Sequence, residues 1–287
     1  MSPREASLLS DFSLEITGKD IDRLTAAAPN LPLGTRVHLT YLDSEDLEIR
    51  VKAAGVCGDL GLVPVPHVAA RRLRSSGELE EFLTCLADIS AAARLFVVGG
   101  DPAVPLGPYP DALSVLRSAM PRRFGLVEAG IAGYPEGHPD IATDVLWRAL
   151  EDKAALLSET GLAGSVVTQF GFDSDAVLDW IEEVRSRGIA LPVRVGVPGP
   201  AGIRRLVRYA TRFGVGTSAG IVRKYGFSIT NLVGAAGPDR FLRDLARRWE
   251  PRRHGDVRIH FYSFGGVEAT VEWITEFIAR RGGEDAR

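Results

Sequence analysis

Three short segments place polar or aromatic side chains directly after apolar runs. They are Val98–Pro102, which contains Gly-Gly-Asp, the loop Ala132–Pro139, and Thr168–Asp173. Apolar runs of this length are typical of buried parallel strands, and a barrel of parallel strands carries its chemistry where the strands end. A carboxyl group there can move a proton or balance a cation, and a primary amide offers both a donor and an acceptor. Asp101 and Gln169 are therefore candidate site residues.

The elements that must position these side chains follow a regular pattern. Eight runs, most of them nearly continuous in apolar residues, predict strands, and amphipathic segments such as Asp111–Met120 and Asp175–Arg187 predict helices between them. The predicted strands are Ser13–Thr17, Arg36–Leu42, Leu62–Val68, Arg94–Val98, Leu126–Gly133, Ser165–Phe170, Pro192–Val197 and Val257–Phe264. Eight strands that alternate with helices predict one (β/α)8 TIM barrel, a single domain over residues 1–287.

The composition excludes several classes of function. The 287 residues are 45% hydrophobic and 25% charged, which is ordinary for a globular protein, and a net charge of −3 gives no reason to expect nucleic acid as a partner. The two cysteines, Cys57 and Cys85, form no CxxC motif, and the five histidines lack metal-ligand spacing, so we expect no metal. No signal peptide or membrane-spanning run is evident, and we expect a soluble cytoplasmic protein.

Further motifs stand at the ends of other predicted strands. They are Leu14-Glu15, Val37–Thr40, Val65–His67, Val195–Pro198 and Ile259–Tyr262. In this order, and together with the three segments above, they resemble the methylenetetrahydrofolate reductase family over its catalytic barrel. The resemblance implies FAD as cofactor and NADH or NADPH as electron donor. It also implies reduction of 5,10-methylenetetrahydrofolate to 5-methyltetrahydrofolate for methionine biosynthesis. A homo-oligomer is possible, and we expect no nucleic-acid or membrane partner.

The chemistry of that reaction assigns roles to four residues. The methylene bridge must open to a cationic iminium before it accepts hydride, and opening requires a general acid. Glu15 matches the acid of the family, provided that burial raises its pKa; an exposed carboxylate at the end of a strand is the alternative. The resemblance assigns Asp101 to stabilisation of the iminium, and Gln169 and Phe172 to substrate binding. Core packing is the alternative for Phe172.

The resemblance also assigns a group of residues to the cofactor. Tyr134 packs near the flavin, His138 contacts its ribityl–phosphate side, and Lys153 approaches the phosphates. Thr40, His67, Gly100, Asp101 and Tyr109 complete the expected cofactor-binding set. A turn-capping histidine and a solvated helix lysine are the alternatives for His138 and Lys153.

Three departures from the family pattern stand out. The arginine that contacts the FAD pyrophosphate is replaced by Gly99, and the cluster Arg71–Arg74 is a candidate substitute or a solvated helix face. Ile16–Gly18 replaces an aromatic and proline run, and Gly214–Gly220 is an unfamiliar glycine-rich segment. The alternatives are therefore a flavin-free or reverse-running folate oxidoreductase, and a folate-binding accessory protein without catalytic activity.

Overall fold

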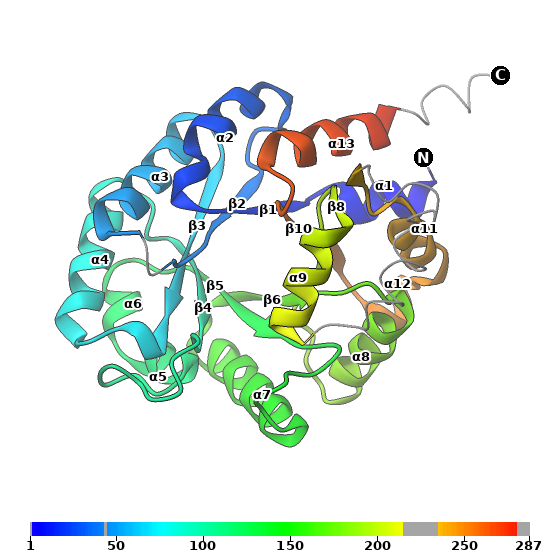
Figure 1. Ribbon diagram of the computed structural model, residues 1–287. Helices are drawn as coiled ribbons and strands as arrows, with labels where there is room; N and C mark the ends of the chain where they lie inside the picture. The colour runs from blue at the N-terminus through cyan, green and yellow to red at the C-terminus, as the bar shows by residue number, and fades with distance from the viewer. Residues whose placement is uncertain (1, 43–44, 215–234, 280–287) are drawn as a thin grey trace.

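A computed structural model describes residues 2–42, 45–214 and 235–279 of the chain. Its centre is a closed barrel of eight parallel strands in the order β1-β10-β7-β6-β5-β4-β3-β2, seen end-on in Figure 1. The strands are β1 Ser13–Ile16, β2 Arg36–Leu39, β3 Val63–Ala69, β4 Arg94–Val98, β5 Glu128–Gly133, β6 Ala163–Phe170, β7 Val193–Pro198 and β10 Val257–Tyr262. The (β/α)8 barrel predicted from the sequence is thus confirmed.

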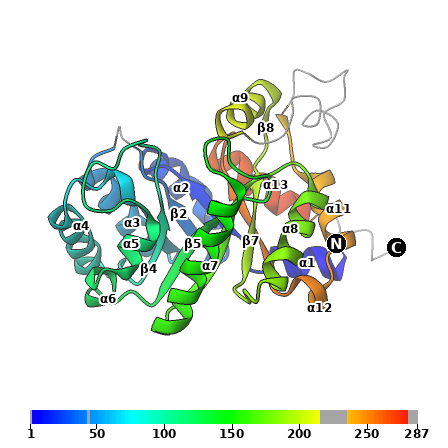
Figure 2. The same ribbon diagram turned by 90° about the horizontal axis from the view of Figure 1, so that it is seen from below.

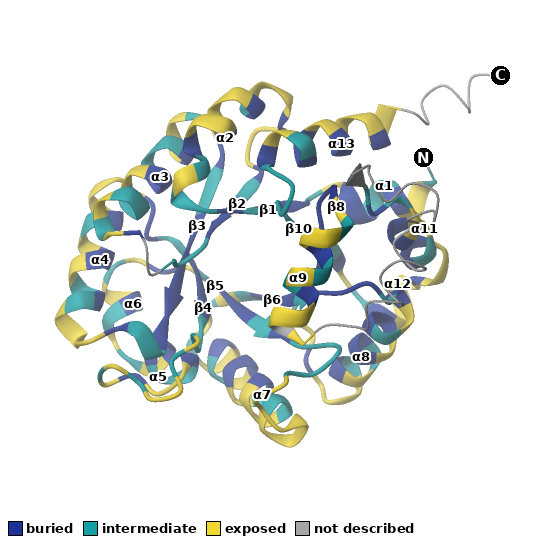
Figure 3. Ribbon diagram, in the orientation of Figure 1, coloured by how far each residue is buried: buried dark blue, intermediate teal, exposed yellow. Residues whose placement is uncertain are grey.

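Helices surround the barrel and connect its strands. They are α2 Ile21–Ala27, α3 Leu47–Asp59, α4 Ser76–Asp88, α5 Ala112–Arg117, α6 Met120–Arg123, α7 Thr143–Thr160, α8 Ser174–Ser186, α11 Asp239–Arg248, α12 Pro251–His254 and α13 Val267–Ala279. An additional helix, α1 Pro3–Leu9, precedes β1, and the 3-10 turns are η1 Gly18–Asp20, η2 Ala28–Asn30 and η3 Ala70–Arg72. In Figure 3 the helices turn exposed residues outward and buried ones toward the strands.

The two faces of each strand have different neighbours. On β1, Leu14 and Ile16 point outward into the main hydrophobic core beneath the helices. Ser13 and Glu15 alternate with them and therefore point into the barrel, where they meet side chains of β10 and β3. The parallel registers Glu15↔Tyr262 and Glu15↔His38 fix which side chains meet around Glu15.

The connection from β7 to β10 is longer than a single helix. It contains β8 Ala201–Gly202 and β9 Ala235–Ala236, which pair antiparallel, and helix α9 Ile203–Phe213. Figure 2 shows α9 and β8 beyond the ring of helices, at the end of the barrel where β7 finishes. Gly214 ends α9 with a φ of 68°. The rest of the glycine-rich segment noted in the sequence lies outside the described residues.

One predicted helix differs from the structure. The segment Asp111–Met120 is divided into α5 and α6, because Ser118 is extended, with φ −63° and ψ 147°. Pro121 follows at the start of α6, where its missing N–H costs no helical hydrogen bond. The second predicted helix, Asp175–Arg187, corresponds to α8, and Asp173 accepts a hydrogen bond from the N–H of Asp175 at its start.

Within the described residues, no helix has both the length and the apolar character needed to span a lipid bilayer.

Candidate functional site

The centre of the candidate site is Glu15, at the carboxyl end of β1. Its side chain is only 15% exposed, and its Oε2 lies 3.3 Å from Nε2 of His260 and 3.9 Å from Nε2 of His67. The other ring nitrogen of His260, Nδ1, lies 2.8 Å from the hydroxyl of the buried Ser13. A hydrogen-bonded chain therefore runs from Ser13 through His260 to Glu15.

The order of the pKa values in this cluster is the reverse of that in free side chains, because the carboxyl group has a higher pKa than the imidazoles. Burial raises the pKa of Glu15 from 4.5 to about 7, against the opposing attraction of His67. Burial lowers the pKa of His67 to about 4 and that of His260 to about 3, and Arg194 lowers the latter further. Below about pH 7 the cluster therefore holds its proton mainly on the carboxyl group, and the imidazoles are neutral.

A third histidine extends the cluster toward the opposite end of the barrel. His38 on β2 is buried, and its Nδ1 lies 3.3 Å from Nε2 of His67. Burial, followed by the charges of His260, His67 and two arginines, holds its pKa well below the usual value. Its ring packs edge-on against His260, with the ring centroids 4.6 Å apart. The three imidazoles are thus a rigid support for Glu15.

The pKa values of two tyrosines at the barrel mouth respond to Glu15 and Asp101. The hydroxyl of Tyr262 donates to the carbonyl of Thr168 at 3.0 Å. Burial raises its pKa well above the usual value, with further contributions from Glu15 and Tyr134. Burial likewise raises the pKa of Tyr134, and Asp101 adds to the effect. Both phenols are therefore neutral hydrogen-bonding groups at neutral pH.

Asp101 is the exposed carboxylate of the site. Its side chain is 74% exposed and lies 3.1 Å from Nη2 of Arg72. Gly100, just before it, has a φ of 91°, and a Cβ there would lie 3.3 Å from the Cβ of Ala69. A glycine is favoured at that conformation, which turns the chain so that Asp101 follows directly after β4.

The loop after β4 folds back onto η3. The N–H of Arg71 donates to the carbonyl of Gly99, and the N–H of Leu106 donates to the carbonyl of Arg71, both at 2.8 Å. The Arg71 guanidinium is hydrogen-bonded to the carbonyl of Ala103. These contacts use Arg71 to hold the loop in place.

The end of β6 is shaped by an irregularity in its pairing. The register with β7 shifts between Val167 and Phe170. The hydroxyl of Thr168 accepts the N–H of Gly196 at 2.8 Å and donates to the carbonyl of Gln169 at 2.9 Å. This bulge alters the local backbone at Gln169, which is partly exposed at the barrel mouth.

The remaining predicted site residues lie in surroundings that suit a structural role. Phe172 is 4% exposed in a cluster with Phe170, and Tyr109 is 7% exposed in the main core. Nδ1 of His138 accepts the N–H of Asp140 at 3.1 Å, which is the turn-capping alternative. Lys153 is buried on α7, where burial lowers its pKa to about 8.

Thr40 has a clear local role. Its hydroxyl and its N–H both reach the carbonyl of Ile16, at 3.1 and 3.0 Å, and so tie the ends of β1 and β2 together.

The structure brings six of the predicted residues together on one face of the barrel, at the carboxyl ends of their strands. They are Glu15, Thr40, His67, Asp101, Tyr134 and Gln169. Sequence reasoning gave no role to Ser13, and it quoted His38, His260 and Tyr262 only as parts of motifs. Two-residue alternation along β1, β2 and β10 was the available signal, because it places these side chains inside the barrel. In the described part of the chain, no group of three or more His, Cys, Asp or Glu side chains could hold a metal ion.

Comparison with known proteins gives a partial likeness to one family. No family model matches the chain. The chain is 29% identical over 160 residues to methylenetetrahydrofolate reductase (NADH) 1 of Arabidopsis thaliana, a match that covers 54% of this chain and 26% of that protein. It is 28% identical over 87 residues to methylenetetrahydrofolate reductase 2 of Saccharomyces cerevisiae, covering 30% and 14% respectively. The matched regions thus span about a quarter or less of these relatives.

Solved structures give a second, looser likeness. Dihydropteroate synthase from Thermus thermophilus superposes with a TM-score of 0.49 at 14% identity, covering 94% of this chain and 93% of that one. Dihydropteroate synthase from Burkholderia cenocepacia gives 0.45 at 16% identity, covering 96% and 93%. These values add nothing to the barrel topology described above.

Proposed function

We propose that the protein reduces 5,10-methylenetetrahydrofolate to 5-methyltetrahydrofolate with hydride that originates from NADH or NADPH. The observation that carries the proposal is the buried carboxyl group of Glu15 inside the barrel mouth, where it contacts His260, which Ser13 holds in turn, and where burial raises its pKa to about 7. Partial likeness to methylenetetrahydrofolate reductases from a plant and a yeast supports the same substrate class.

Glu15 is the proton donor in this proposal. Opening of the methylene-bridged ring needs a proton on the leaving folate nitrogen, and a carboxyl group with a pKa of about 7 holds one at neutral pH. His260 positions the carboxyl group through Nε2 and is itself fixed by Ser13 through Nδ1. Neither histidine competes for the proton, because burial lowers the pKa of each far below that of Glu15.

Asp101 is the counter-charge for the cationic iminium. Its carboxylate is exposed at the mouth, on the same face as Glu15, and one guanidinium, that of Arg72, partly neutralises it. Tyr134 and Tyr262 lie close enough to the two carboxyl groups for their pKa values to respond. Gln169, at the end of β6, offers a donor and an acceptor to the pterin edge.

The residues present do not fit the FAD pyrophosphate as the resemblance describes it. Gly99 offers no charge, the guanidinium of Arg71 is bonded to Ala103, and that of Arg72 is paired with Asp101. Lys153, the other expected phosphate contact, is buried with its pKa lowered to about 8. An anionic pyrophosphate therefore has no ready cation at these four positions, and Arg74, the last arginine of the cluster, is exposed to solvent.

This observation favours a second form of the same function, in which hydride passes directly from the nicotinamide to the folate. The roles of Glu15 and Asp101 are unchanged, because the ring must open and the iminium must be stabilised whichever group delivers the hydride. The two forms differ only in the need for a flavin.

One pair of measurements tests both points. The purified protein is examined for flavin absorbance, and NADH or NADPH oxidation with methylenetetrahydrofolate is then followed with and without added FAD. Turnover by a colourless protein without FAD supports direct transfer of hydride from the nicotinamide to the folate. Turnover that requires added FAD supports transfer through the flavin. If neither condition gives 5-methyltetrahydrofolate, the proposed function is wrong.

A further inference from the structure

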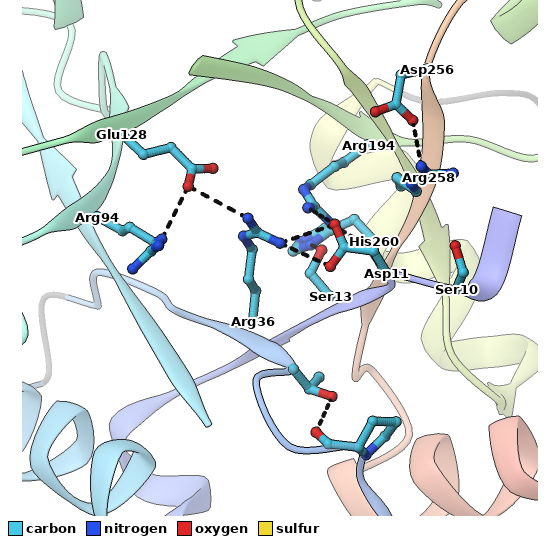
Figure 4. Close-up of polar contacts among 12 residues, drawn as sticks. Ser10, Asp11, Ser13, Arg36, Arg94, Glu128, Arg194, Asp256, Arg258 and His260 are labelled. Carbon is cyan, nitrogen blue, oxygen red and sulfur yellow. Dashed lines mark hydrogen bonds and ion pairs between the residues drawn. The ribbon is translucent and has the colours of Figure 1, made fainter. Parts of the chain in front are cut away.

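The opposite end of the barrel, where the strands begin, holds a network of charged side chains that the proposed reaction does not use. Figure 4 shows its members, which come from the segment before β1, from five strands and from the residue that precedes β10. Nη1 of Arg36 lies 2.8 Å from Oδ1 of Asp11, and Nη2 of Arg194 lies 2.6 Å from Oδ2 of the same residue. Oε2 of Glu128 lies 3.0 Å from Nε of Arg94 and 3.5 Å from Nη2 of Arg36.

The charges in this network do not balance. Arg258, the fourth arginine, pairs with Asp256 at 3.1 Å. Among the described residues, four guanidinium groups of the network therefore face three carboxylates, which leaves an excess of one positive charge. His38 adds no charge, because its pKa lies well below the usual value. Burial lowers the pKa of Arg194 as well, and the neighbouring Arg36 lowers it further, as expected for cations without full compensation.

Two donors of the network also lack acceptors. Within the part of the chain that the structure describes, Nε of Arg36 and Nε of Arg194 are buried without a hydrogen-bond partner. The side chain of Arg194 is only 5% exposed, so bulk water does not satisfy it. Buried donors of this kind are rare in folded proteins and call for an acceptor.

A small cavity lies beside these donors. Both arginines line it, together with Arg94, Glu128, His38 and Ser165. The cavity is large enough for a single occupant of about the size of a water molecule and too small for a polyatomic anion. A water molecule would satisfy the donors and leave the excess charge, whereas a monatomic anion would accept from both donors and balance the charge.

We propose that this cavity binds one monatomic, monovalent anion of about the size of chloride. The anion completes the floor of the barrel between Arg36 and Arg194, on the side of His38 that faces away from Glu15. The inference goes beyond the proposed reaction, because none of the lining residues is assigned to folate, nicotinamide or flavin.

The test compares anions at constant ionic strength. The thermal midpoint of the full-length protein is measured while chloride or bromide replaces methanesulfonate, and bromide-soaked crystals are examined for an anomalous peak. A saturable rise in Tm with either halide, and a peak beside Arg36 and Arg194, are expected. Equal Tm in all anions, an equal rise with sulfate, or a crystal without a peak in the cavity would overturn the proposal in favour of a bound water.

A matched pair of variants ties the effect to the network. Arg94→Gln removes the excess charge through a side chain that is 36% exposed, and we expect it to abolish the halide dependence. Arg123→Gln removes the same charge from an exposed pair with Glu80 and should leave the dependence unchanged. If Arg94→Gln does not fold, the bromide peak in the unmodified protein decides the question. A halide effect that persists undiminished in folded Arg94→Gln would refute the charge argument.

Discussion

Replacement of Glu15 by glutamine should make the protein more stable at alkaline pH while it removes activity. Burial raises the pKa of Glu15 from 4.5 to about 7, so the folded state holds a proton that the unfolded chain releases. As the pH rises from 4.5 through 7, ionisation therefore favours unfolding, and above pH 7 the full cost applies. Because each pKa unit corresponds to about 1.36 kcal/mol, the change in the Glu15 pKa from 4.5 to about 7 lowers the free energy of unfolding at alkaline pH by about 3 kcal/mol.

Glutamine carries no such cost, since it remains neutral at every pH. Glu15→Gln should therefore unfold together with the unmodified protein near pH 4, and at a temperature roughly 5–10 °C higher at pH 8. Differential scanning calorimetry across that range measures the effect. Glu81→Gln on α4 is the control, because Glu81 is exposed and should leave the difference unchanged.

Activity should change in the opposite direction. Loss of a positioned general acid lowers the rate by about 10²–10⁴-fold. In the unmodified protein, folate reduction should fall as the pH rises through about 7, where Glu15 loses its proton. If the protein binds flavin, reduction of that flavin by NADH should survive in Glu15→Gln, since it requires no proton on folate. A variant with full folate reduction, or one that is no more stable than the parent at pH 8, would refute the reasoning.

Three further substitutions examine the supporting structure. Ser13→Ala removes the partner of His260 at 2.8 Å and should lower kcat about fivefold with KM unchanged, for a hydrogen bond worth roughly 1 kcal/mol. Steady-state kinetics that show only a raised KM would contradict this. Lys153→Met should raise stability near pH 7 by up to about 3 kcal/mol, because burial lowers the lysine pKa from 10.5 to about 8 and the unfolded chain binds the proton more readily. The advantage should vanish above pH 10.5, and urea titrations that show no gain at pH 7 would count against it. Gly196→Ala places a Cβ 2.4 Å from the carbonyl of Thr168 and should cost about 1–3 kcal/mol in the same assay, whereas an unchanged midpoint would show that the bulge can relax.

The strands could be predicted from the sequence because both of their faces are covered. The side chains of β4, β6 and β7 that face the helices are apolar, and enough of the inward ones are apolar too, so the runs are nearly continuous. The helix after β4 was predicted less well, because apolar spacing continues across the extended Ser118. Amphipathic spacing reports the face that a segment buries, and it does not report a break in the backbone.

The candidate site could be predicted in part. Their position at the ends of predicted strands, together with the resemblance, predicted that Glu15 and Asp101 lie at one face of the barrel, but a motif gives a position without its burial. Phe172 packs in a buried cluster and His138 caps its own turn, as their alternative interpretations describe. The charged floor was not predicted at all, because arginines near the starts of strands look like solvated ends until the barrel closes around them.

The two ends of the barrel are coupled through the histidines between them. Arg194 lowers the pKa of both His38 and His260. The positive charge at this end of the barrel therefore disfavours protonation of either histidine beneath the site. With neutral imidazoles around it, Glu15 has no strong cation among the described residues to stabilise its ionised form, and burial sets its pKa. A free histidine binds a proton more tightly than a free carboxylate, and here the order is reversed. Arg194 thus disfavours a proton on the two histidines, and burial is what keeps the proton on Glu15, the group that faces the folate in the proposed reaction.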